Sequence, residues 1–142
     1  MENNKVLVSV YCLAYNHEKY IRDCLEGFVK QKTNFKFEVI VHDDASTDKT
    51  ADIIREYAAN YPDIIKPILQ KENRYSRGES IPLKYILPKC QGKYIAICEG
   101  DDYWICDTKL QQQADVLENH PEYIACVHAN KVINYLNNIE NV

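Results

Sequence analysis

Three carboxylates lie within four residues, at Glu99, Asp101 and Asp102, directly after an apolar run over residues 94–98. Like charges repel, so folding would not gather these acids at a strand end without compensation. A divalent cation is the simplest compensation, because hard ions such as Mg²⁺ and Mn²⁺ bind carboxylate oxygens. Gly100 would let the backbone bend so that Glu99 and Asp101 face one point. We therefore predict a metal–diphosphate site at the end of a buried central strand; the alternative is a solvated acidic turn.

A second acidic pair, Asp43 and Asp44, follows another apolar run over residues 37–41 and precedes a helix. One of the two could cap that helix, although Ser46 and Asp48 make this unnecessary. A carboxylate also accepts hydrogen bonds from the imide N–H of uracil or from ribose hydroxyls. We favour nucleoside recognition for this pair.

The roles within the first acidic group can be ranked by chemistry. Breaking a sugar–phosphate bond builds charge on the departing diphosphate, and a bridging cation neutralises that charge. We favour Asp101 as a metal ligand, Glu99 as a ligand directly or through water, and Asp102 as a contact to sugar hydroxyls. Arg77, in the polar loop 71–80, is a candidate phosphate contact, with simple solvation as the alternative.

The elements that must position these side chains alternate between strand and helix patterns. Strands are predicted over residues 6–11, 37–41, 64–69, 94–98 and 123–128, and helices over 21–29, 51–61, 81–90 and 110–117. Asn16 is predicted to cap the first helix, and Ser46 or Thr47 the second. The alternation predicts an α/β fold with an open, mostly parallel sheet covered by helices on both faces. Ligands of such sheets bind where the strands end, so three loops should converge on that edge, which we call the rim.

Composition narrows the classes of function. The 142 residues suit one domain, residues 1–142, with a weakly patterned tail over 130–142, and the net charge of −4 gives no basic face for nucleic acid. Four scattered glycines form no phosphate-binding glycine-rich motif. The six cysteines read as buried free thiols. With no signal peptide and no apolar span, we expect a cytoplasmic protein without a transmembrane segment.

Taken together, the segments 8–16, 41–48, 94–104 and 110–117 resemble the nucleotide-binding half of family 2 glycosyltransferases, which have the GT-A fold. The resemblance covers about residues 5–128. It implies inverting transfer of a sugar from a nucleotide donor, usually a UDP-sugar, to a saccharide or other hydroxyl acceptor, with Mg²⁺ or Mn²⁺ and at times at the inner membrane face. It assigns Asp43 and Asp44 to contacts with the nucleoside, and Glu99 and Asp101 to the DxD motif that binds metal and diphosphate. It assigns Ala14, Tyr15 and Asn16 to the loop that lines the base.

Two features depart from that family pattern. Glu99 stands where the DxD motif has aspartate, and it reaches one methylene further. The acidic general base of the family has no counterpart, since the remaining candidates do not follow its pattern: Asp115, Glu118, Glu122 and Glu140. We therefore expect donor binding with little or no transfer, as in an incomplete GT-A fold. The alternative is a non-catalytic nucleotide-sugar-binding subunit, and an exposed final strand edge would favour a homo-oligomer.

Overall fold

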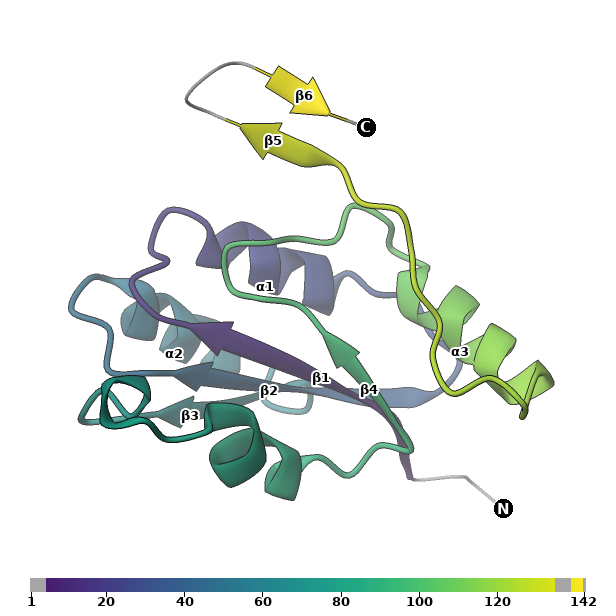
Figure 1. Cartoon of the computed structure of the whole chain (residues 1–142), viewed down its shortest axis with the longest axis horizontal. Helices are drawn as coiled ribbons and strands as arrows, with labels where there is room; N and C mark the ends of the chain where they lie inside the picture. Colours follow the sequence, from purple (N-terminus) through teal and green to yellow (C-terminus); the bar gives the residue numbers. More distant parts are fainter. Residues whose placement is uncertain (1–4, 135–138, 142) are drawn as a thin grey trace.

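A four-stranded parallel sheet forms the centre of the protein (Figure 1). The computed structural model describes residues 5–134 and 139–141. The strand order is β3-β2-β1-β4. The strands are β1 (Val6–Ala14), β2 (Lys36–Asp43), β3 (Ile65–Leu69) and β4 (Tyr94–Ile97), and the α-helices are α1 (Ile21–Val29), α2 (Thr50–Asn60) and α3 (Lys109–Asn119). Within the described residues, no helix is both long and apolar enough to cross a membrane.

Both faces of the sheet are covered, as predicted. Alternate residues of β1, such as Val10 and Cys12, pack in the main core with Phe28 of α1 and residues of α2 and α3. On the opposite face, Ile40 of β2 packs with Ile86 and its neighbours in a second core cluster. The open parallel α/β sheet expected from the alternating pattern is therefore confirmed (Figure 1).

The covering segment on the second face is less regular than the single short helix predicted over 81–90. It consists of a π-helix, η2 (Pro82–Ile86), followed by a 3-10 helix, η3 (Leu87–Lys89). Leu87 N–H bonds to the carbonyl of Pro82, five residues back, and Pro88 has no N–H with which to continue an α-helical ladder. A further 3-10 turn, η1 (Tyr75–Arg77), lies in the polar loop.

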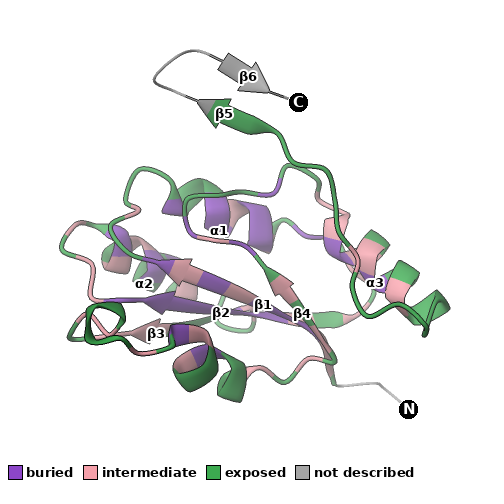
Figure 2. Cartoon of the chain, viewed as in Figure 1, coloured by how far each residue is buried: buried purple, intermediate pink, exposed green. Residues whose placement is uncertain are grey.

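Two strand predictions differ from the structure. β4 is an edge strand of the described sheet rather than a central one, and Ile95 and Ile97 are 41% and 59% exposed because η2 and η3 do not cover them. The strand predicted over 123–128 is wrong: Ile124 and Val127 lie exposed in irregular backbone (Figure 2). The described strands of the 130–142 tail are instead an antiparallel pair, β5 (Val132–Asn134) with β6 (Ile139–Asn141).

A buried polar cluster sets where β4 begins. Ser9 of β1 donates its hydroxyl to Glu38 of β2 at 2.7 Å, and both side chains are buried. Gln91 N–H donates to Glu38 Oε1 at 2.8 Å, and Gly92 N–H donates to Ser9 Oγ at 2.8 Å. These bonds place Tyr94 opposite Val8, and therefore fix how far β4 reaches toward the rim.

Candidate functional site

The three loops predicted to converge do meet at the rim. Ala14, which ends β1, lies opposite Asp43, which ends β2. Asp44 N–H donates to the Ala14 carbonyl at 3.0 Å, and on the other side of β1 Gly100 N–H donates to the Leu13 carbonyl at 2.7 Å. The two acidic segments, 56 residues apart in sequence (44 to 100), are therefore both bonded to the last residues of one strand.

The loops after β1 and β2 are tied together by Asn16. Its N–H donates to Ser46 Oγ at 2.9 Å, and its side-chain oxygen accepts from Thr47 N–H at 2.8 Å. The backbone of Asn16 is left-handed, with φ 55°, a conformation that asparagine tolerates. The predicted capping role is wrong, because α1 begins at Ile21 and its N-cap position is Tyr20.

The second helix is also capped differently from the prediction. Neither Ser46 nor Thr47 caps α2, whose N-cap position is Lys49. Asp48 accepts a hydrogen bond from Thr50 N–H at 2.9 Å, in the first turn of the helix. Ser46 and Thr47 are used instead to join the two rim loops.

Asp43 and Asp44 are both buried, and both already accept hydrogen bonds within the protein. Asp43 accepts from the N–H and the hydroxyl of Ser46. Asp44 accepts from Arg74 N–H at 2.8 Å and Tyr75 N–H at 3.0 Å, one bond on each carboxylate oxygen. Since an ionised carboxylate has about four acceptor positions, these bonds do not fill all the acceptor positions of either acid. Asp44 has a second role that the sequence did not reveal, which is to hold the 71–80 loop at the rim.

We expect Asp44→Ala to loosen that loop. Hydrogen bonds to a charged acceptor contribute about 1.5–3 kcal/mol each, so loss of the buried carboxylate should lower the free energy of unfolding by about 2 kcal/mol. Trypsin should also cleave faster after Arg74 and Arg77. Urea unfolding and timed proteolysis measure the two effects. Asp52→Ala, which removes an exposed acid paired with Arg55, should leave both within error; equal cleavage of the two variants would contradict the role given to Asp44.

Arg77 lies on η1, in the segment that Asp44 anchors. Its guanidinium pairs with Glu72 at 2.7 Å, and its side chain is half exposed. Arg74 is less exposed and lies 3.6 Å from Glu72 and 3.8 Å from Glu79. A phosphate that binds Arg77 would therefore have to displace the carboxylate of Glu72 from the guanidinium.

Gly100, in the acidic turn after β4, lies where there is no room for a side chain. A Cβ at Gly100 would lie 2.8 Å from His17 Nδ1 and 2.9 Å from the Leu13 carbonyl oxygen. The φ angle of Gly100 is not positive, so the bend proposed from sequence is not the reason for glycine here. The turn is pressed directly against the end of β1 and the ring of His17.

The carboxylates of this turn differ in exposure. Asp101 and Asp102 are exposed, whereas Glu99 is partly buried. Burial raises the pKa of the Glu99 carboxyl, the neighbouring charges of Asp101 and Asp102 add to the rise, and His17 partly offsets it. An anionic Glu99 is therefore costly in the folded protein unless a cation lies nearby.

We expect Glu99→Gln to stabilise the protein at neutral pH. A carboxyl whose folded pKa exceeds its unfolded value favours folding most when protonated, and that contribution is lost as pH rises through the folded pKa. The gain in thermal midpoint of Glu99→Gln over wild type should therefore be larger at pH 7 than at pH 4. Thermal melts at both values measure it. Equal melting differences at the two pH values would contradict the prediction.

The residues of the acidic turn suit a hard cation without forming a cage for one. Among the described residues, no group of three or more His, Cys, Asp or Glu side chains is placed to hold a metal ion. Mg²⁺ and Mn²⁺ need only one or two protein carboxylates when phosphates and waters complete the shell. The exposed Asp101 and the partly buried Glu99 are therefore a donor set that fits these ions.

The segment after the acidic turn is anchored on α1. Trp104 is buried, packs edge-on against Phe28 with ring centroids 4.9 Å apart, and has Lys109 Nζ 4.2 Å from its ring. A Cβ at Gly27 would lie 3.0 Å from Trp104 backbone atoms, so a larger residue would require the chain at Trp104 to shift by a few tenths of an ångström. Trp104 therefore belongs to the core, whereas the neighbouring Tyr103 is exposed.

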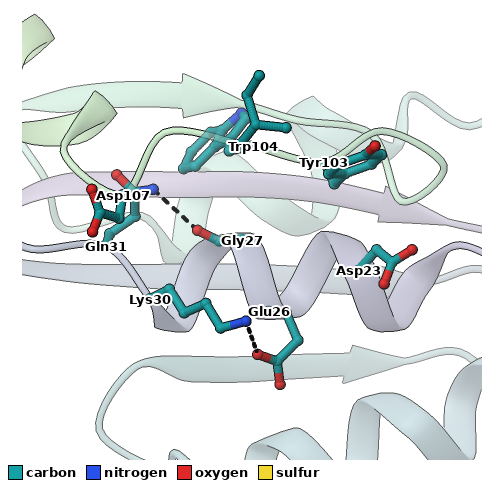
Figure 3. Close-up of a pocket in the computed structure, with 9 residues that line it drawn as sticks. Asp23, Glu26, Gly27, Lys30, Gln31, Tyr103, Trp104 and Asp107 are labelled. Carbon is teal, nitrogen blue, oxygen red and sulfur yellow. Dashed lines mark hydrogen bonds and ion pairs between the residues drawn. The ribbon is translucent and has the colours of Figure 1, made fainter. Parts of the chain in front are cut away.

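A buried glutamine completes this anchor. Gln31 donates its amide to the carbonyls of Gly27 and Cys106 and accepts from Leu110 N–H at the start of α3. A cavity of about 440 Å³ lies beside it, between α1 and residues 103–107, and the acids of the rim are not among the residues that line it (Figure 3). Nothing in the sequence pattern singled out Gln31 or Gly27, because their roles depend on a contact between distant segments.

The acids considered as general bases lie elsewhere. Glu118 of α3 binds Lys93 and Tyr94, at the opposite end of β4 from the rim. Asp115 accepts from Gln111 within α3, and Glu122 contacts His120. Glu140 lies outside the residues whose side chains are described. Figure 1 shows α3 toward the end of the sheet where the strands begin.

Comparison with known proteins identifies the family of this chain. The family model for glycosyl transferase family 2 matches residues 9–140. An uncharacterized protein of Mycobacterium tuberculosis, Rv1520, is 47% identical over 126 residues, covering 89% of this chain and 36% of the relative. The chain thus spans about a third of the length of that relative.

Solved structures agree with the fold. The Staphylococcus aureus protein TarS, in complex with UDP-GlcNAc, matches with a TM-score of 0.68 and 32% identity over 82% of this chain and 32% of that one. A mannosyltransferase from Pyrobaculum calidifontis, in complex with GDP-Man and Mn²⁺, matches with a TM-score of 0.67 and 27% identity over 80% of this chain and 32% of that one. The sheet of this protein is therefore that of the GT-A fold. A match over nearly the whole sequence, on a sheet whose acidic loops meet at one edge, shows that the chain belongs to glycosyltransferase family 2.

Proposed function

We propose that this chain binds the nucleoside diphosphate part of a nucleotide sugar, with UDP-sugars preferred, and that the whole protein transfers the sugar to an acceptor hydroxyl with inversion. The main support is the bonding of both acidic segments to the end of β1, through Asp44 to Ala14 and Gly100 to Leu13. The complexes of TarS with UDP-GlcNAc and of the Pyrobaculum enzyme with GDP-Man add family-level support.

The proposal gives each rim residue a task. Asp43 and Asp44 accept hydrogen bonds from the nucleoside, and Ala14, Tyr15 and Asn16 line the base. Asp43 is held rigidly by Ser46, and such fixed acceptors discriminate between bases because they cannot turn away from a wrong partner. Tyr15 is 45% exposed and is therefore free to contact the base.

Glu99 and Asp101 are the residues that would hold Mg²⁺ or Mn²⁺, and the ion would supply positive charge to the leaving diphosphate. Asp102 is exposed beside them and is assigned to the sugar hydroxyls. Arg77 is assigned to a phosphate, in exchange for Glu72. Ordering these groups before the donor arrives lowers the entropic cost of binding it.

A nucleotide panel tests the donor class. UDP, GDP, CDP and ADP are titrated into the protein with Mn²⁺ present. UDP is expected to bind more tightly than CDP and ADP, because the uracil imide N–H matches a carboxylate acceptor and the corresponding ring nitrogens of cytosine and adenine carry no hydrogen. Equal binding of all four nucleotides would contradict the assigned role of Asp43 and Asp44.

A second candidate function is a nucleotide-sugar-binding subunit without transfer activity. It is favoured by the placement of Glu118, Asp115 and Glu122 away from the rim. The two candidates differ in turnover: a transferase releases UDP from a UDP-sugar when acceptor hydroxyls are supplied, and a binding subunit does not. The assay compares UDP release with and without a mixture of saccharide acceptors.

A further inference from the structure

His17 lies at the corner where the loop after β1 becomes the first turn before α1. Its N–H donates to Thr50 Oγ1 at 2.8 Å, at the start of α2. Its carbonyl accepts from Tyr20 N–H at 2.9 Å and Ile21 N–H at 2.8 Å. The backbone of His17 is thus held by both helices that flank the rim, so the position of its ring is fixed by the fold.

The ring of His17 faces the acidic turn. Its Nδ1 is buried, has no hydrogen-bond partner among the described residues, and lies 2.8 Å from where a Gly100 Cβ would be. The ring is close enough to Glu99 to affect the electrostatics of that carboxyl. His17 belongs to none of the sequence motifs from which the site was predicted.

The lack of a partner at Nδ1 decides which ring nitrogen carries the proton. A neutral imidazole has one N–H and one bare nitrogen. A proton on Nδ1 would be a buried donor without an acceptor, which the folded state disfavours. The neutral ring therefore carries its proton on Nε2, which would then act as the donor.

We propose that His17 is a further donor-binding residue, whose Nε2–H donates a hydrogen bond to a phosphate oxygen of the nucleoside diphosphate. This rests on the proposed function of the rim. The turn beside His17 holds three carboxylates, which repel a diphosphate, so a fixed N–H donor next to them supplies the complementary contact. His17 also touches the turn that is assigned to metal and diphosphate, and it is anchored to the turn before α2, so it lies between the nucleoside and diphosphate parts of the site.

The test separates contact with phosphate from support of the fold. UDP and uridine are titrated with Mn²⁺ into the wild type and into His17→Leu, His17→Gln and His17→Asn, with His128→Leu as an exposed control. Glutamine places an amide nitrogen near the position of Nε2, and asparagine places one near that of Nδ1. We expect at least a tenfold loss of UDP affinity in the Leu and Asn variants, near wild-type affinity in Gln, and unchanged uridine affinity in all.

Two results would overturn the inference. One is wild-type UDP affinity in the Asn variant, and the other is an equal loss for uridine and UDP, which would indicate a role in shaping the loop alone. The Gln–Asn comparison remains decisive if the Leu variant does not fold. A ¹⁵N spectrum of the wild-type histidines adds a separate check, since it must show the Nε2–H form of His17. If the wild type binds no UDP at all, the proposed function of the rim fails first, and this inference falls with it.

Discussion

Asp101→Asn is expected to remove the metal dependence of UDP binding. The change keeps the shape of the side chain and deletes one charge from the exposed acidic turn, which is the proposed contact with the cation. UDP affinity in Mn²⁺ should fall at least tenfold, which corresponds to about 1.4 kcal/mol. Thermal stability should not fall, because removing one of three neighbouring carboxylates relieves repulsion on Glu99. Calorimetric titration and thermal melting measure the two quantities.

Asp115→Asn is the matched control for Asp101→Asn. Asp115 lies on α3 and accepts a hydrogen bond from Gln111, away from the rim. The Asp115→Asn variant should bind UDP in Mn²⁺ with wild-type affinity. If Asp101→Asn retained full metal-dependent affinity, the assignment of the metal to the turn after β4 would be wrong.

Gly92→Ala is expected to be the most destabilising of the glycine changes. A Cβ at position 92 would lie 2.4 Å from Ser9 N and 2.7 Å from the carbonyl carbon of Val8, and neither backbone atom can move without shifting β1. Overpacking of this kind costs about 3 kcal/mol or more. For a chain of this size, that loss lowers the midpoint of thermal unfolding by roughly 10 °C. The displaced β4 should also carry the acidic turn out of place and weaken UDP binding.

Gly78→Ala separates crowding from backbone strain. Gly78 has a φ of 75°, and nothing lies within 4 Å of its Cβ position, so alanine there suffers strain alone. That strain costs about 1 kcal/mol. Gly92→Ala should therefore lose at least twice as much free energy of unfolding, as measured in urea. Similar losses for the two variants would mean that the contact of Gly92 with Ser9 yields easily.

The sequence was informative where a pattern acts locally. Apolar runs placed β2 and β3, and helical spacing placed α1 and α2 to within a few residues. The parallel sheet followed from the alternation of the two patterns, and with it the meeting of Asp44 and Gly100 at the end of β1. Strand ends were less exact, since β1 continues beyond residue 11 through Cys12 and Leu13 to Ala14, all paired with β2.

Contacts between distant segments were beyond the sequence. Asparagine is a residue type that commonly caps helices, but Asn16 instead ties two loops together in a left-handed conformation. Gly100 is required by the approach of His17, and Gly27 is favoured by the close crossing of Trp104; neither neighbour is close in the chain. The strand predicted over 123–128 also failed, because β-rich composition alone does not decide whether a segment pairs with a sheet.

The central claim is that the acids of the rim bind a cation and a nucleoside diphosphate together. Calorimetric titration of UDP into the wild-type protein, once with Mn²⁺ and once with a chelator, tests it most directly. The account predicts saturable binding with Mn²⁺ and at least tenfold weaker binding without it. Absence of binding in both titrations, or equal affinity in the two, would contradict it.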